Sequence, residues 1–219
     1  MPPCRYLETL GLRGGLPHEL ELHRDRVRRT LLHAGGTPEG HPLLEELVPE
    51  RLVARLKAEL GEGYRAEQLY RLSYSYDPER VHELRCLAYV PRRLERLVLW
   101  ELPDGFDYSY KYADRSFFEA VQAELLPEEL PLFVRSDGSL SDTSYTNIVL
   151  WTAAGYRTPE HPLLEGTERR RLLEAGRISA APLTLMDLSA CRGVYLINAM
   201  MPLESAPLLP PPELVIRRV

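Results

Sequence analysis

The chain has 219 residues, 44% of them hydrophobic, which is enough to build the buried core of one large domain or two small ones. A net charge of −5 and arginines interleaved with glutamates argue against binding to nucleic acid or to an anionic membrane. Three scattered cysteines without CxxC spacing argue against a disulfide framework or a metal site, and no apolar run is long enough to span a bilayer, so we expect a soluble cytoplasmic protein.

The first half of the chain carries signals for both helices and strands. Residues 5–12 predict a strand, and apolar side chains at helical spacing predict an amphipathic helix over 19–34. Pro49 suits the first turn of another helix, with apolar residues on one face up to Leu60. Period-two patterns then predict strands over 69–74, 84–90 and 94–102. This half is therefore expected to be α+β, with an antiparallel sheet and helices.

Pro103-Asp104-Gly105 is the best candidate for an interdomain hinge. Beyond it, helices are predicted over 114–126 and near 165–175. Short strands are predicted at 132–135, 147–151, 183–186 and 194–197. We therefore predict a small N-terminal domain over 1–102, a linker over 103–110 and a larger C-terminal domain over 111–219.

Two residues of the second half could carry chemistry. Lys111 follows an aromatic, hinge-like loop and precedes an apolar helix, so its amine could be partly desolvated and nucleophilic; a solvated surface lysine is the commoner case. Asp142 lies in a Ser- and Thr-rich stretch before Asn147. It could be a turn or capping residue, or a carboxylate partner for a positively charged ring nitrogen. On local sequence alone, Asn147 is an ordinary turn residue.

Two further positions could bind an anion. Arg26 follows His23 by three residues, so both project from nearly one helix face, which could be an exposed polar face or could bring a guanidinium to a phosphate. Gly166-Thr167 opens a helix, where backbone amides and a hydroxyl form an anion site, although a plain N-cap explains Thr167 equally well. No Ser-His-Asp motif with a G-x-S-x-G elbow, no H-E-x-x-H and no Walker loop is present.

Taken in order, these pieces resemble the class IV aminotransferase family, whose members use pyridoxal 5'-phosphate (PLP) on fold type IV. The family pattern F-E-T followed by L-x-x-H-x-x-R-L resembles residues 7–9 and 20–27, which end on Arg26-Val27. The family's K-x-x-x-R matches Lys111 and Arg115, and E-x-x-x-x-N-I-F resembles the stretch from Asp142 through Asn147. The motif L-x-G-I-T-R resembles residues 164–169, and I-C-N-A-L-M-P of the aminodeoxychorismate lyases resembles residues 197–202.

The resemblance implies a two-domain fold, with a small N-terminal antiparallel sheet and a larger C-terminal pseudo-barrel with helices. It implies that Lys111 is the catalytic lysine that holds PLP and that Asp142 faces the pyridinium nitrogen. The implied phosphate ligands are Arg26, Gly166, Thr167, Asn198 and Ala199. A homodimer is implied as well.

The chain departs from the family pattern at two positions. Asp142 replaces a glutamate, which makes the carboxylate one methylene shorter, and Glu168 stands where G-I-T-R has threonine. An acidic Glu168 near a phosphate would be unfavourable unless it points away.

The run Asn198-Ala199-Met200-Met201-Pro202 favours an aminodeoxychorismate lyase of folate biosynthesis, which converts 4-amino-4-deoxychorismate to 4-aminobenzoate and pyruvate. An aminotransferase acting on branched-chain or D-amino acids is the alternative enzyme. Residues that would bind the substrate carboxylate are only guessed, at Arg71 and Arg92. A PLP-free relative with a binding role is the third hypothesis, motivated by Asp142 and Glu168.

Overall fold

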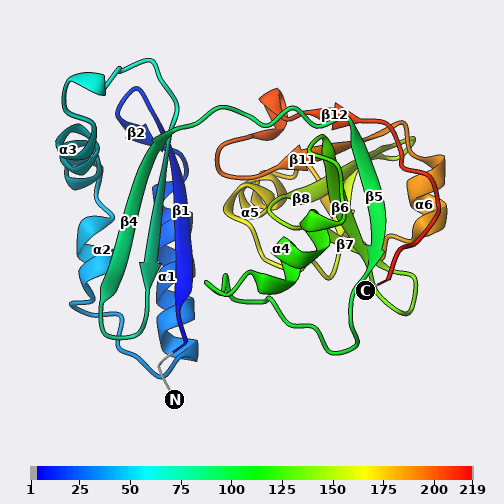
Figure 1. Cartoon of the computed structure of the whole chain (residues 1–219), viewed down its shortest axis with the longest axis horizontal. Coiled ribbons are helices and arrows are strands. Elements are labelled where there is room, and N and C mark those ends of the chain that lie inside the picture. Colours follow the sequence, from blue (N-terminus) through cyan, green and yellow to red (C-terminus); the bar gives the residue numbers. More distant parts are fainter. Residues whose placement is uncertain (1–3, 219) are drawn as a thin grey trace. The chain divides into compact units, whose positions relative to one another are not determined.

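The computed structural model describes residues 4–218, which form two compact units. The first unit comprises the described part of Met1–Val90 together with Tyr110–Asp114. The second comprises Pro91–Ser109 and the described part of Arg115–Val219. Helices and several mostly antiparallel sheets alternate along the chain (Figure 1), so the predicted α+β fold class is confirmed.

The first unit is one antiparallel sheet with helices on one face. Its elements are β1 (Tyr6–Arg13), β2 (Leu16–Pro17), α1 (Leu20–His33), α2 (Pro42–Glu46), α3 (Pro49–Leu60), η1 (Gly61–Gly63), β3 (Tyr70–Tyr76) and β4 (Val81–Ala88). The sheet order is β2-β1-β3-β4. Gly14 and Gly15 both have positive φ, which allows the tight turn between β1 and β2.

Alternation along the strands decides which side chains enter this core. On β1, Tyr6, Glu8, Leu10 and Leu12 are buried, because every second side chain of a strand points to the same face. Leucines from all three helices and the tyrosines of β3 complete the cluster. Glu8 is thus a carboxylate placed on an otherwise apolar face, and it needs polar partners there.

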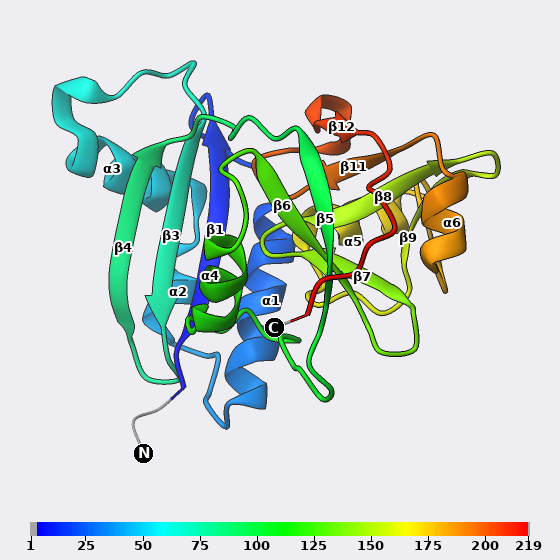
Figure 2. The same ribbon diagram turned by 45° about the vertical axis from the view of Figure 1, so that its right-hand side comes forward.

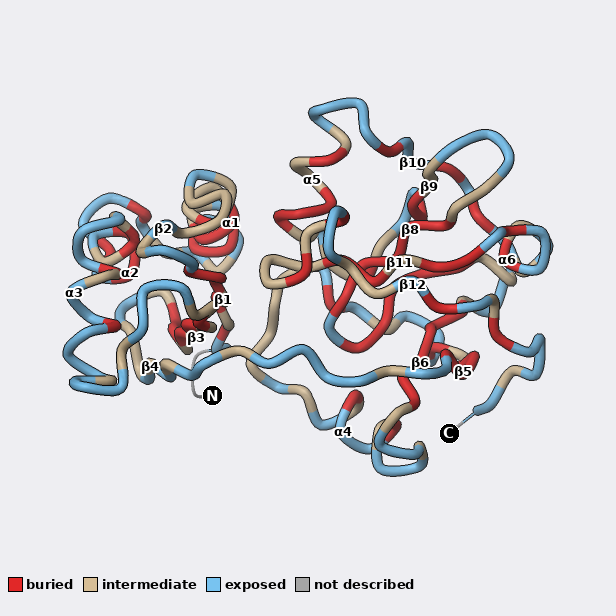
Figure 3. The backbone as a smooth tube through the Cα atoms, turned by 90° about the horizontal axis from the view of Figure 1, so that it is seen from above, coloured by how far each residue is buried: buried red, intermediate tan, exposed pale blue. Residues whose placement is uncertain are grey.

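The second unit contains two sheets around a common core. Its elements are β5 (Arg96–Glu101), α4 (Ser116–Ala123), β6 (Glu129–Val134), β7 (Leu140–Thr143), β8 (Asn147–Thr152), β9 (Gly155–Pro159), α5 (Thr167–Glu174), β10 (Ser179–Ala181), α6 (Leu185–Ala190), β11 (Gly193–Ile197), η2 (Leu203–Ser205) and β12 (Leu208–Leu209). The sheet orders are β10-β9-β8-β11-β12 and β5-β6-β7. Apolar side chains of both sheets form one cluster. Figure 3 shows the contrast between the mostly buried strands β8 and β11 and strand β4 of the first unit, whose residues are intermediate or exposed.

The C-terminal segment protects the open edge of the three-stranded sheet. Arg217 forms a parallel bridge with Trp100 of β5, and its backbone exchanges hydrogen bonds with Leu99 and Glu101. Figure 2 shows this segment running beside β5. Covering an edge strand in this way satisfies backbone groups that would otherwise be open to pairing with another chain.

Two predictions about single elements are wrong. The strand predicted over 94–102 was assigned to the antiparallel sheet of the first half, but β5 pairs in parallel with β6 in the second unit. The second half of the strand predicted at 183–186 is the start of helix α6, which begins at Leu185. Thr184 and Asp187 form a capping box at its start, and this local hydrogen bonding favours a helix over a short apolar strand.

The described residues contain neither a membrane-spanning helix nor a metal-binding cluster. Within residues 4–218, no helix combines the length and the apolar character needed to cross a bilayer. Over the same residues, no three His, Cys, Asp or Glu side chains come together in a way that could hold a metal ion.

Candidate functional site

Arg26 and His23 meet the buried carboxylate of Glu8 in the first unit. Both project from the buried face of α1 that covers β1. The Arg26 guanidinium binds Glu8 in a bidentate way, with Nε donating to Oε2 at 3.0 Å and Nη2 donating to Oε1. His23 Nδ1 lies 2.6 Å from Glu8 Oε1. Of the two interpretations of this helix face, the exposed polar face does not apply, because Arg26 and His23 are buried.

The protonation equilibria of Glu8 and His23 are shifted by each other and by Arg26. Burial alone would favour protonated Glu8, but the Arg26 guanidinium and the His23 hydrogen bond hold the pKa of Glu8 far below its usual range. Burial lowers the pKa of His23, and the positive charges of Arg26 and Lys111 act in the same direction. The group therefore carries an ionised carboxylate, a guanidinium and a neutral imidazole at neutral pH, with the charge of Lys111 close by.

Lys111 lies on a short segment that extends the first unit's sheet beside β1. Its carbonyl accepts a 2.7 Å hydrogen bond from the Leu7 amide, and Tyr112 forms an antiparallel bridge with Tyr6. Tyr110, on the other side of Lys111, stacks on the His33 ring at a centroid distance of 3.7 Å. Two tyrosines thus anchor the backbone on both sides of a partly buried lysine.

Lys111 is also one of only two lysines among the 27 basic residues that are lysine or arginine. The other, Lys57, lies on α3 with its ammonium over the Tyr64 ring at 5.6 Å. Arginine can supply surface charge as well as lysine does, but it does not lose its proton in proteins and so cannot act as an amine nucleophile. Lys111 is therefore a candidate for amine chemistry, which none of the arginines could supply.

Asp142 is the central polar residue of the second unit. Its Oδ2 accepts hydrogen bonds from Asn147 Nδ2 at 2.8 Å and from the amides of Leu163 at 2.8 Å and Leu164 at 3.3 Å. Its Oδ1 is buried and accepts no hydrogen bond from any residue within 4–218. Burial raises the pKa of Asp142 to about 6, against the lowering effects of these donors and of the Arg169 charge. A buried carboxylate oxygen without a donor is an acceptor that a ligand could use.

Gly166 and Thr167 begin helix α5 next to this carboxylate. Gly166 is the N-cap and Thr167, which is buried, is the first helical residue. Asn147 joins the two groups, because its Nδ2 also donates to the Leu164 carbonyl at 2.8 Å, just before the cap. The structure thus brings Asp142 together with the N-terminus of α5, where backbone amides favour an anion.

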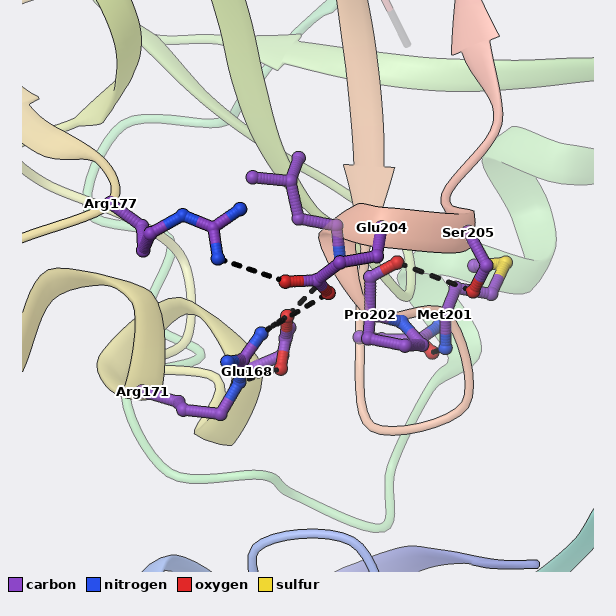
Figure 4. Close-up of polar contacts among 9 residues, drawn as sticks. Glu168, Arg171, Arg177, Met201, Pro202, Glu204 and Ser205 are labelled. Atoms are coloured by element: carbon purple, nitrogen blue, oxygen red, sulfur yellow. Dashed lines mark hydrogen bonds and ion pairs between the residues drawn. The ribbon is translucent and has the colours of Figure 1, made fainter. Parts of the chain in front are cut away.

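Glu168 lies beside Arg171 and Glu204 (Figure 4). Its carboxylate is fully buried and binds Arg171 in a bidentate way at 2.8 and 2.7 Å. It also accepts a 3.1 Å hydrogen bond from the Leu203 amide. Arg171 and Arg177 both contact Glu204 in the same group. The acidic side chain that replaces the family threonine therefore connects α5 to the loop after β11.

Asn198 and Ala199 lie in a turn at the end of β11. The Asn198 amide donates to the Met201 carbonyl at 3.1 Å, and its Oδ1 accepts from the amides of Met200 and Met201. Its Nδ2 reaches the Tyr145 carbonyl at 3.4 Å, which places this turn next to the β7–β8 connection. The Asn198 side chain thus shapes the turn, whose Ala199 amide remains a predicted anion donor.

Sequence reasoning left three polar residues out of the site. Glu8 and His23 fall within the matched motifs, and Asn147 was interpreted as an ordinary turn residue, yet all three are buried and hydrogen-bonded to site residues. The sequence does contain a signal for such residues. Each is polar but stands at a position that the strand alternation or the helical spacing predicts to be in the core. Of the two guessed carboxylate ligands, Arg71 and Arg92, Arg92 donates through Nε to the Pro127 carbonyl at 2.8 Å.

The amino-acid sequence was compared with known families and proteins. The pattern of the amino-transferase class IV family matches residues 6–205. An uncharacterized protein of Haemophilus influenzae is 29% identical over 193 residues, which cover 88% of this chain and 96% of that protein.

Solved structures resemble the whole chain. A "putative 4-amino-4-deoxychorismate lyase" from Haemophilus somnus is 26% identical with a TM-score of 0.74, over 91% of this chain and 98% of its own. A hypothetical aminotransferase from Mycobacterium tuberculosis in a PLP-bound form is 21% identical with a TM-score of 0.72, over 99% and 84% of the two chains. A "putative amino-acid aminotransferase" from Mesorhizobium loti is 18% identical with a TM-score of 0.69, over 98% and 99%.

Proposed function

The chain belongs to the class IV aminotransferase family, and on that premise we propose that it is a PLP-dependent lyase converting 4-amino-4-deoxychorismate to 4-aminobenzoate and pyruvate. The observation that carries the cofactor assignment is the buried Oδ1 of Asp142, which has no donor within residues 4–218. A protonated ring nitrogen offers one N–H donor, which such an oxygen needs. The residues present therefore fit PLP.

The proposal gives each side chain a role toward the cofactor. Lys111 would hold PLP covalently through its amine. Asp142 would accept the ring N–H and keep that nitrogen protonated. Arg26 and the amides of Gly166 and Thr167 at the start of α5 would bind the phosphate, since a guanidinium and a helix N-terminus both favour it. Bound PLP supplies an electron sink for the bond that breaks at the substrate carbon.

Lys111 has a second role in the proposed reaction. The freed Lys111 amine would take the proton from the carbon that bears the substrate nitrogen. The enolpyruvyl group would then leave and take up that proton at its methylene carbon to become pyruvate, and the remaining ring would become aromatic. The substrate provides all the atoms of both products, so no keto acid is consumed.

The lyase assignment is supported by the turn after β11. Asn198-Ala199-Met200-Met201-Pro202 resembles the corresponding run of aminodeoxychorismate lyases, and Asn198 organises it through five hydrogen bonds with Met200, Met201 and Tyr145. The 26% identity with the structure named as such a lyase agrees with this assignment. Folate biosynthesis in the cytoplasm and a homodimeric state belong to the same proposal.

Pyruvate release separates the lyase from the aminotransferase alternative. Purified protein loaded with PLP is expected to release one pyruvate per 4-aminobenzoate from 4-amino-4-deoxychorismate, without added keto acid. Lys111→Ala should abolish the release, whereas Lys57→Ala should leave it unchanged. Turnover that strictly requires 2-oxoglutarate would overturn the lyase and support an aminotransferase of branched-chain or D-amino acids. Protein that binds no PLP would instead support a relative with a binding role.

A further inference from the structure

Asn147, the first residue of β8, joins three segments of the second unit. Its single amide nitrogen donates to Asp142 Oδ2 on β7 and to the Leu164 carbonyl before α5, both at 2.8 Å. An amide NH₂ group has two hydrogens, so these two bonds use its full donor capacity. The side chain is buried, and losing either bond would leave a buried polar group unsatisfied.

The other end of the same amide rests against Gly166. A Cβ atom added at Gly166 would lie 2.0 Å from Asn147 Oδ1 and 3.2 Å from its Cγ. The φ of Gly166 is −67°, which any residue can adopt, so the glycine is required by space and not by backbone conformation. The Asn147 amide thus contacts the N-cap of α5 as well as Asp142.

These contacts fix how the Asp142 carboxylate is turned. Oδ2 faces three protein donors, so Oδ1 is directed to the side where no residue within 4–218 donates to it. Burial raises the pKa of this carboxyl, and the hydrogen bond from Asn147 is the strongest influence in the opposite direction. Without that bond, burial would favour the neutral acid more strongly.

We propose that Asn147 is a positioning residue that sets both the orientation and the ionisation of Asp142 and holds the Gly166 turn beside it. The claim that Asp142 Oδ1 faces the ring nitrogen of PLP rests on the proposed function. The effect of Asn147 on the titration of Asp142 does not depend on PLP, so the two claims can fail separately.

The test is a carboxyl titration of the full chain by NMR, with ¹³C-labelled aspartate and Asp142→Asn to assign the signal. Asn147→Ala should raise the titration midpoint of Asp142 by about one pH unit or more, because a hydrogen bond to a charged group is lost. Asn147→Asp, which keeps the volume of the side chain, should raise it further by placing a second carboxylate beside the first. This variant also serves if Asn147→Ala does not fold.

Thr146→Val is the matched control. Thr146 is buried next to Asn147 and exchanges its hydrogen bonds with Thr143, not with Asp142. Its substitution should lower stability and leave the midpoint of Asp142 unchanged. An unshifted midpoint in a folded Asn147 variant, or an equal shift in Thr146→Val, would overturn the inference.

The same variants distinguish this inference from the proposed function. In visible absorbance titrations with PLP, both Asn147 variants should bind the cofactor about tenfold or more weakly than the unchanged chain, which corresponds to one lost charge-assisted hydrogen bond. An unchanged chain that binds no PLP would overturn the proposed function, while a shifted Asp142 midpoint in the same samples would still support the role of Asn147.

Discussion

At the scale of single residues, Asp142 combines stability and chemistry in one side chain. Burying a carboxylate without a full set of hydrogen-bond donors lowers the stability of the fold. Such groups are typical of functional sites, where the carboxylate takes part in binding or catalysis. The unsatisfied Oδ1 and the raised pKa are two consequences of the same burial. Natural ligand binding would supply the missing donor and recover part of that free energy.

The raised pKa predicts how stability without cofactor depends on pH. The folded state binds the Asp142 proton more tightly than the unfolded state, in which the pKa is near 3.8. The contribution of Asp142 is therefore fully present below pH 3.8 and is lost as the pH rises through about 6. The loss is on the order of 2–3 kcal/mol.

Urea unfolding of PLP-free protein between pH 4 and 8 measures this loss. The free energy of unfolding of the unchanged chain should fall relative to that of Asp142→Asn as the pH rises across the interval. Other groups, such as Glu8 with its lowered pKa, titrate in both proteins and cancel in the difference. Parallel pH profiles for the two proteins would show that Asp142 titrates normally.

At the scale of elements, the buried carboxylate of Glu168 helps to hold helix α5 in place, in addition to apolar contacts. Three of its first residues, Thr167, Glu168 and Arg169, are buried. Glu168 bonds Arg171 within the helix and the Leu203 amide outside it, so its carboxylate links the start of α5 to the loop after β11. The substitution of the family threonine by glutamate thus has a structural use.

We predict that Glu168→Ala destabilises the protein by about 2–4 kcal/mol, because it removes the bidentate carboxylate bound by Arg171 and the acceptor of the buried Leu203 amide. Glu174→Ala removes the exposed ion pair with Arg170 on the same helix and should change stability by less than about 0.5 kcal/mol. Chemical unfolding of the two variants provides the comparison. Equal, small effects would mean that the Glu168 contacts contribute little to stability.

Elements with strong periodicity could be predicted from the sequence, whereas the pairing of strands with one another could not. The helix over 19–34 and the Pro49 helix correspond to α1 and α3, because helical spacing and a first-turn proline are local signals. The parallel pairing of β5 with β6 depends on contacts some 30 residues away, which no local pattern encodes. The four-residue β7, which carries Asp142, is too short and polar for its alternation to stand out.

The same distinction holds for the candidate site. Motif order identified Lys111, Arg26 and Asp142 as candidates. It did not identify the residues that hold them, since Glu8 and Asn147 act through contacts 18 and 5 positions away in the chain. Their burial is a property of packing, and only the structure provides it.

At the scale of the whole molecule, the path of the chain assigns Lys111 to the first unit. Residues 91–109 and those from Arg115 onward belong to the second unit, but Tyr110–Asp114 belong to the first, where Lys111 and Tyr112 pair with β1. The predicted linker over 103–110 therefore ends where the chain returns to the first unit's sheet. Lys111 and Arg26 belong to one folded unit, and Asp142 and the start of α5 belong to the other.

Reductive trapping of PLP tests the central claim most directly. The full chain is incubated with PLP, reduced with borohydride and digested, and the cofactor label is located by mass spectrometry. We predict a label on Lys111 and none on Lys57, the only other lysine. Lys111→Ala should lose both the label and the visible absorbance, and Lys57→Ala should keep both. An unlabelled Lys111, or equal labelling of both lysines, would contradict the assignment of Lys111 as the lysine that holds PLP.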